Sequence, residues 1–336
     1  MDLVTLARRL VDIPSVSGEE GEVGRFVAAL LADLGYRVEV FEAAPGRPNV
    51  LATTERCPTV VLSTHLDTVP PHIPARVTGD ALSGRGACDA KGIVAAQVVA
   101  AERLRAQGIE ELGLLFLVDE EMGSLGARAA NTHARARECR WLIDGEPTDN
   151  RLAQGSKGSL RLTLRSDGVA AHSAYPEHGR SAIDALLDAL AEVRRCTWPS
   201  DPALGDTTVN VGVIAGGTRP NVVAAAAHAD LQIRLVSDAE LVKRQLERAV
   251  AGRARIDYLS AVNPAWLATV PGFPTCVVRF TTDIPNLTNW GTPLLFGPGS
   301  ILEAHTDHER IAVTELEAGA DGYVRLVQAL LRRRAA

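Results

Sequence analysis

Three short apolar runs in this chain each end close to an acid or a histidine. The runs cover residues 59–63, 112–118 and 141–143. The residues that follow them are, in the same order, His65, the pair Glu120 and Glu121, and Glu146. Continuous apolar strands are typical of a sheet that is buried on both faces. In open α/β sheets, sites assemble outside the carboxyl ends of the strands. The sequence therefore predicts an α/β fold with one polar site at the edge of a largely parallel sheet.

Helical periodicity separates these runs. Apolar residues recur at helical spacing over 20–34, and residues 91–106 and 314–333 also have helical patterns. Strands that alternate with helices indicate layers of helices packed on a sheet.

Residues 157–261 have a different pattern. Residues 160–165 alternate like a half-exposed strand, and residues 181–195 form a strong helical pattern. The full order of strand, helix, two strands, helix and strand suits a ferredoxin-like α+β unit. The α/β pattern then resumes. We therefore expect a discontinuous catalytic domain of residues 1–156 and 262–336, with 157–261 inserted as a separate domain.

Composition limits the classes of partner. The chain has 336 residues, enough for two domains. Its 35 basic and 41 acidic residues include no basic block, so we expect no nucleic-acid partner. No apolar run reaches the roughly 20 residues that a membrane span needs, and the N-terminal residues lack a secretion-signal pattern. The five cysteines are scattered, which predicts free thiols in a reducing compartment and a cytoplasmic protein.

Histidines and acids recur in separated short motifs. These are Ser63-Thr-His65-Leu-Asp67, Gly84-Arg-Gly-Ala-Cys-Asp89, Asp119-Glu120-Glu121, Asp144-Gly-Glu146 and Ala304-His305-Thr306. Imidazole nitrogen and carboxylate oxygen are ligands that suit Zn²⁺. The set predicts a site for two zinc ions with one carboxylate left over as a base.

Position within the motifs suggests individual roles. Asp67 can orient the imidazole of His65 through its second nitrogen. Asp89 follows a glycine-rich turn, where a carboxylate can bridge two metal ions. The side chains of Glu120 and Glu121 diverge at a strand end, so one can bind metal while the other acts as a base on water.

Two motifs leave a choice between neighbours. Asp144 is a rival of Glu146, and His308 lies close to His305. Each motif alone has an ordinary structural explanation, such as a capped turn or a solvated helix start. The set is specific because several unrelated explanations would have to coincide.

Together these motifs resemble those of the dinuclear-zinc amidohydrolases and peptidases. This family includes acetylornithine deacetylases, succinyl-diaminopimelate desuccinylases, aminoacylases and glutamate carboxypeptidases, and the match runs from about Leu3 to Leu331. The resemblance implies two divalent ions, with zinc as first choice and cobalt or manganese as alternatives. It implies these roles: His65, Asp89 and Glu146 on one ion, Asp89, Glu121 and His305 on the other, Asp67 orienting His65, and Glu120 as general base.

The inserted segment resembles the dimerisation or lid domain of the same family. The resemblance implies that His172 reaches the active site of a partner subunit and donates a hydrogen bond to the oxyanion. It places Arg219 and Asn221 where the family binds a substrate carboxylate, with Arg234 as a second possibility. Asp283 falls in a segment similar to the family's Thr-Asp specificity loop.

The resemblance implies a homodimeric enzyme that hydrolyses the amide of an N-acyl amino acid. Our first expectation is a deacylase of arginine or lysine biosynthesis, like acetylornithine deacetylase or succinyl-diaminopimelate desuccinylase. The alternatives are a dipeptidase or carboxypeptidase of the family, and a hydrolase that releases lysine or ornithine from an amino-group carrier protein. A metal-dependent binding protein without catalysis is a further alternative, against which the carboxylate at Glu120 argues.

Overall fold

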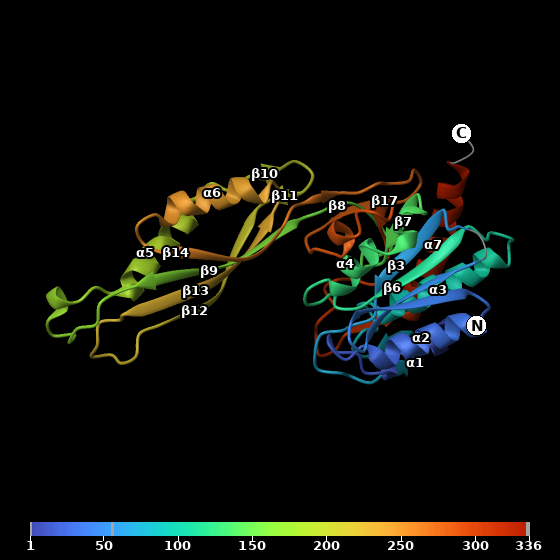
Figure 1. The fold of residues 1–336 in the computed structure, drawn as a ribbon, viewed down its shortest axis with the longest axis horizontal. Helices are drawn as coiled ribbons and strands as arrows, with labels where there is room; N and C mark the ends of the chain where they lie inside the picture. The colour runs from blue at the N-terminus through green and yellow to red at the C-terminus, as the bar shows by residue number, and fades with distance from the viewer. Residues whose placement is uncertain (1, 55–56, 334–336) are drawn as a thin grey trace. The chain divides into compact units, whose positions relative to one another are not determined.

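The computed structural model describes residues 2–54 and 57–333. The chain divides into two units, which Figure 1 draws in sequence colours. Unit 1 comprises Met1–Gln154, Leu267–Cys276 and Thr282–Ala336, and unit 2 comprises Gly155–Trp266 and Val277–Thr281. The segment Val277–Thr281 differs from expectation, because the sequence assigned it to the catalytic domain whereas it packs with unit 2.

The main sheet has nine strands and is mixed. Its strand order is β1 (Arg37–Ala44), β2 (Arg47–Thr53), β6 (Leu112–Leu117), β3 (Val60–His65), β7 (Trp141–Asp144), β17 (Thr292–Leu295), β8 (Leu152–Ser156) and β15 (Ala265–Trp266), and β16 (Thr275–Val278) also pairs with β8. The four central strands β6, β3, β7 and β17 are parallel to one another. Antiparallel pairs β1–β2, β2–β6, β17–β8 and β15–β8 flank them. Parallel pairing is therefore confined to the centre of the sheet, where the sequence predicted the apolar strands.

Helices cover both faces of this sheet in unit 1. Alternate side chains of a strand point to opposite faces, and here they enter two separate cores. Leu62 and Leu114 pack with α1 (Leu3–Asp12), α2 (Gly21–Asp33), α3 (Lys91–Arg105) and α7 (Val313–Arg332). Val61 and Leu115 pack with α4 (Leu125–Asn131), with the short helix η1 (Ala134–Arg137), and with Leu287 and Trp290 just after the short helix η3 (Ile284–Asn286). The result is a three-layer arrangement (Figure 1), and the expected α/β fold is confirmed.

A small antiparallel sheet was not predicted from the sequence. It consists of β4 (Arg76–Thr78), β5 (Ala81–Ser83) and β18 (Arg310–Ala312). Its pairing of Arg310 with Ser83 brings the segment after β5 beside the segment before β18. These are the segments that carry the 84–89 and 304–306 motifs.

Unit 2 contains a four-stranded antiparallel sheet with two helices on it. Its strand order is β12 (Thr208–Gly216), β13 (Ala226–Leu235), β9 (Gly158–Asp167) and β14 (Arg255–Val262). The helices α5 (Ala182–Arg195) and α6 (Ala239–Val250) share one hydrophobic core with the sheet. A two-residue hairpin, β10 (Ser200–Asp201) and β11 (Gly205–Asp206), and the short helix η2 (Pro176–His178) complete it. This chain order and strand order are those of a ferredoxin-like unit.

The two ends of unit 2 are hydrogen-bonded neighbours. Gly155 pairs with Trp266 and Ser156 pairs with Ala265 in an antiparallel ladder. The chain thus enters and leaves unit 2 side by side.

Two compositional expectations concern the whole chain. All five cysteines are free thiols, as expected. Among the residues that the structure describes, no helix is long and apolar enough to cross a membrane.

Candidate metal centre

Parallel strands place most of the expected ligands at one edge of the unit 1 sheet. His65 is the last residue of β3, and Glu120 and Glu121 lie on the turn after β6. Glu146 follows β7 by two residues, and β3 is parallel to both neighbours. The expectation drawn from the strand ends therefore agrees with the observed positions. Asp89 does not follow a strand of this sheet but lies just before α3.

Asp89 lies between two histidines in the structure. Its Oδ1 is 3.0 Å from Nε2 of His65, and its Oδ2 is 3.5 Å from Nε2 of His305. His305 Nε2 is also 2.9 Å from Oε1 of Glu121. A carboxylate that offers a different oxygen to each histidine has the arrangement needed to bridge two cations.

The remaining acids join the same cluster. Ligand atoms of His65, Glu120 and Glu146 lie within 4.8 Å of one another, and so do those of His65, Asp89 and Glu121. These groups differ from the ligand sets that the resemblance implies, because Glu120 lies with His65 and Glu146. The roles of the individual acids therefore remain predictions, although the structure brings all of them together.

Asp67 contacts His65 mainly through its backbone. Nδ1 of His65 is 2.9 Å from the Asp67 carbonyl oxygen and 3.6 Å from Oδ1. The Asp67 carboxylate instead accepts the N–H of Glu120 at 3.0 Å, the N–H of Glu121 at 3.2 Å and the Ser17 hydroxyl at 2.7 Å. Asp67 thus orients the acid pair as well as the histidine. Ser17 was not identified from the sequence, because it lies 50 residues before Asp67 along the chain.

A buried ion-pair network fixes the turn that carries the acid pair. Asp119 adopts a left-handed backbone with φ of 68°, which is uncommon for a residue other than glycine. Arg47 Nη2 lies 2.6 Å from Asp119 Oδ1 and also pairs with Glu20. Such conformations persist where the surroundings hold them. Neither Arg47 nor Glu20 was identified from the sequence.

The carboxylates of the cluster repel one another. Burial raises the pKa of Glu120 well above its usual value, and Asp283 and Glu121 raise it further against the effect of His65. Burial also raises the pKa of Glu146, with contributions from Glu120 and Asp89. Because divalent cations relieve such repulsion, these charges and the imidazole and carboxylate donors fit a metal centre.

The pKa of Asp89 is shifted in the opposite direction. Burial would raise the pKa of this carboxyl group, but the hydrogen bonds with His305 and His65 outweigh burial and hold the pKa well below its usual range. Asp89 is therefore the carboxylate of the cluster that stays ionised most readily.

Geometry also separates the rival residues. His308 is exposed, whereas His305 contacts two of the acids. Asp144 is buried, but it is not among the groups of clustered ligand atoms within the described residues, whereas Glu146 is. Asp283 is only 2% exposed, and among the described residues neither of its oxygens has a hydrogen-bond partner. This burial favours an indirect role for Asp283 over direct contact with substrate.

Unit 2 contains His172, Arg219 and Asn221 of the residues expected to contact substrate, whereas Asp283 belongs to unit 1. The Ser173 N–H donates to the Asn221 carbonyl oxygen at 3.0 Å, and His172 forms an antiparallel bridge with Val222. The loops of His172 and Arg219 are therefore joined. His172 Nδ1 accepts the Ala174 N–H at 3.1 Å, so the neutral imidazole carries its proton on the exposed Nε2.

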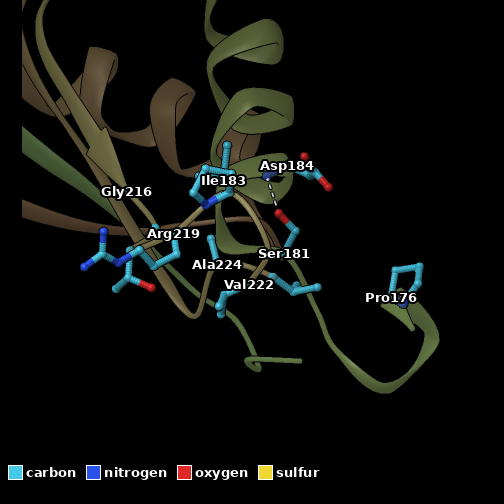
Figure 2. A pocket seen from close by; sticks show the side chains of 12 residues that line it. Pro176, Ser181, Ile183, Asp184, Gly216, Arg219, Val222 and Ala224 are labelled. Atoms are coloured by element: carbon cyan, nitrogen blue, oxygen red, sulfur yellow. Dashed lines mark hydrogen bonds between the residues drawn. The ribbon is translucent and has the colours of Figure 1, made fainter. Parts of the chain in front are cut away.

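Arg219 lines an open hollow of about 600 Å³ in unit 2. Figure 2 shows its side chain on the turn after β12, facing away from Asp184 at the start of α5. Among the described residues, no side chain pairs with the Arg219 guanidinium. Arg234 lies at the other end of β13, opposite Thr208 in the ladder, so it is remote from this hollow.

Comparison with known proteins decides the family. The family model described as peptidase family M20/M25/M40 matches residues 61–329. This chain belongs to that family. The resemblance seen in the sequence motifs is thereby confirmed, and the protein is an M20 peptidase by family.

The similarity to known proteins covers nearly the whole length of this M20 peptidase. A probable carboxypeptidase of Aspergillus terreus is 40% identical over 96% of this chain and 85% of its own length. The aminopeptidase PepT from Bacillus cereus has a TM-score of 0.81 at 20% identity, with 98% of each chain covered. A dinuclear metal-binding M20 peptidase of Bacillus subtilis has a TM-score of 0.70 at 14% identity, covering 97% of this chain and 98% of that one. The last two show the fold.

We expect two divalent cations per chain at this centre. The protein should be stripped with a chelator, reloaded with Zn²⁺ and analysed for metal by mass spectrometry after removal of free ions. His305→Ala should lose the weaker of the two ions, because a histidine ligand is removed. The exposed neighbour provides the control, since His308→Ala should retain both. A stoichiometry below two for the fully loaded wild-type protein would contradict the dinuclear centre.

Proposed function

We propose that this M20 peptidase is a hydrolase with two metal ions that cleaves the amide bond next to a free α-carboxylate, as a carboxypeptidase does. The observation that carries the proposal is Asp89 between His65 and His305, with Glu120, Glu121 and Glu146 clustered around the same residues. An N-acyl amino acid contains the same bond, with a short acyl group in place of a peptide. The deacylase of arginine or lysine biosynthesis thus becomes the second candidate, because relatives near 40% identity are named carboxypeptidases.

Bound cations would supply Lewis-acid activation of the scissile carbonyl and of the attacking water. Glu120 would accept the proton of that water and return it to the leaving amine. Burial raises the pKa of Glu120 above its usual value. Asp67 holds the backbone of Glu120 through the 3.0 Å hydrogen bond, so the base is fixed in place.

Residues of unit 2 would complete the reaction. We assign to His172 the hydrogen bond to the oxyanion, donated from Nε2. We assign to Arg219 and Asn221 the α-carboxylate of the substrate, since a guanidinium donates a matched pair of hydrogen bonds to a carboxylate.

These assignments go together with a proposed homodimer, for which the unit 2 sheet offers an edge. Strand β12 is at the edge of the unit 2 sheet and leaves Val213 and Ile214 about half exposed, at 49% and 53%. An exposed edge strand with apolar side chains readily pairs with another chain. We therefore propose that β12 contributes to a dimer of this chain, in a cytoplasmic protein.

Matched blocked peptides distinguish the possible activities. We expect the Zn²⁺-loaded protein to cleave an N-acetylated dipeptide and to act about 10–100-fold less well on its C-terminal amide, because an arginine contact to a charged group is lost. Acetylornithine and succinyl-diaminopimelate should be tested in parallel. Preference for a free amino terminus, with tolerance of the C-terminal amide, would contradict the proposal.

A further inference from the structure

Glu309 is a buried acid that none of the motifs above includes. Its side chain is 1% exposed, and the residue lies four positions after His305. Oε1 accepts three backbone N–H groups: those of Gly86 at 2.9 Å, Cys88 at 3.1 Å and Asp89 at 3.1 Å. One oxygen of Glu309 thus organises the turn that presents Asp89, including the peptide nitrogen of Asp89 itself.

The other oxygen of Glu309 engages Arg85. The ion pair between Arg85 Nη1 and Glu309 Oε2 measures 2.7 Å, and Arg85 is as buried as Glu309. The same Nη1 donates to the carbonyl oxygen of Thr306 at 3.0 Å. That carbonyl belongs to the residue directly after His305.

His305 itself has an uncommon backbone. Its φ is 63°, in the left-handed region that few residues other than glycine adopt. A residue held there depends on the contacts around it. The hydrogen bond from Arg85 to Thr306 is such a contact, because it fixes the peptide group that follows His305.

We propose that Glu309 and Arg85 are positioning residues that set the distance between Asp89 and His305. This proposal rests on the proposed function, since it concerns ligands of the same metal centre. Glu309 holds the backbone of Asp89, and Arg85 ties Glu309 to the segment of His305. The pairing of β5 with β18 brings the two segments together, and the buried pair sets their final register.

The two expected cation sites differ in which of the two segments supplies their ligands. The resemblance implies one cation on Asp89, Glu121 and His305, which would depend on both segments that the pair joins. It implies the other on His65, Asp89 and Glu146, which would depend only on the Asp89 turn. Loss of the pair should therefore weaken the two binding steps unequally, which a general loss of stability would not do.

Zinc titration of the full chain tests the proposal. Chelator-stripped protein is titrated with Zn²⁺ against a chromophoric chelator, and two stepwise constants are fitted. We expect Glu309→Ala to weaken the step that His305→Ala abolishes by about 10–100-fold, as for other residues that orient metal ligands, and the other step by less. With Co²⁺, the absorption spectrum of the same step should change.

A second variant keeps the test valid if Glu309→Ala fails to fold. Arg85→Lys keeps a positive charge opposite Glu309 but cannot donate with the same reach to both Glu309 and Thr306. It should weaken the His305 step alone. The control is Glu303→Gln in the same segment, whose carboxylate faces the exposed Arg310 at 3.4 Å and should leave both constants unchanged.

The outcomes distinguish a failure of the proposed function from a failure of the positioning role. A wild-type protein that binds fewer than two ions contradicts the proposed function. The positioning role is overturned if the wild-type protein binds two ions and a folded Glu309→Ala or Arg85→Lys variant has both binding constants within threefold of the wild-type values.

Discussion

Replacing Glu120 with glutamine should lower kcat by about 10²–10⁴-fold while both cations stay bound. Loss of a general base typically costs this much. The amide keeps the size and the backbone hydrogen bond to Asp67 but cannot accept a proton from water. Steady-state kinetics on the best substrate, with metal analysis of the same sample, measure the two effects separately.

Glu121→Gln is the matched control for this experiment. Glu121 is the neighbour whose carboxylate lies 2.9 Å from His305, so its loss should weaken metal binding first. Restoring activity with excess Zn²⁺ should succeed for Glu121→Gln and fail for Glu120→Gln. The reverse pattern would show that Glu120 is the metal ligand, a possibility consistent with its place beside His65 and Glu146.

Removing the imidazole of His172 should lower kcat by about 10²–10³-fold with a smaller effect on KM. A donor that contacts only the oxyanion stabilises the transition state more than the bound substrate. His172→Ala is compared with His178→Ala, which removes an exposed histidine from the same loop and should have wild-type kinetics. Equal losses in the two variants would indicate a loop effect and not a hydrogen bond to substrate.

Mixing inactive variants tests whether His172 acts on a second subunit. Hybrid dimers of His172→Ala with Glu120→Gln would have one site with both groups intact. We expect such mixtures to regain up to about half of the wild-type activity per hybrid dimer, once subunit exchange is shown with two affinity tags. Hybrids that form and stay inactive would place His172 in the site of its own chain, or outside the site.

Much of the fold was predictable because local patterns and tertiary burial agree. The apolar run 112–118 became a fully buried central strand, since no polar side chain could face solvent there. Helix α5 matched its predicted range closely, because Ser181 caps it and its apolar stripe is strong. The strands β4, β5 and β18 were missed, since each has three residues and little periodicity.

The residues of the candidate metal centre were predictable for a different reason. Expected ligands such as His65 and Glu146 follow strand ends, where the sheet topology brings distant motifs together. The charged residues that hold these segments in place follow no such pattern in the sequence. Arg47, Arg85 and Glu309 are ordinary charged residues in the sequence, and only the folded chain shows that all three are paired and that Arg85 and Glu309 are buried.

The ladder that pairs Gly155 with Trp266 has a consequence for how this chain could evolve. Seen from unit 1, everything between these two residues is the tip of a β-hairpin. The entropic cost of closing a loop grows only slowly with its length. The size of that tip therefore has little effect on the free energy of folding of unit 1. Insertion, trimming or exchange of unit 2 would leave the metal-binding sheet with the same register. The family's substrate range could thus have diversified by rebuilding one hairpin while the candidate metal centre of unit 1 kept its geometry.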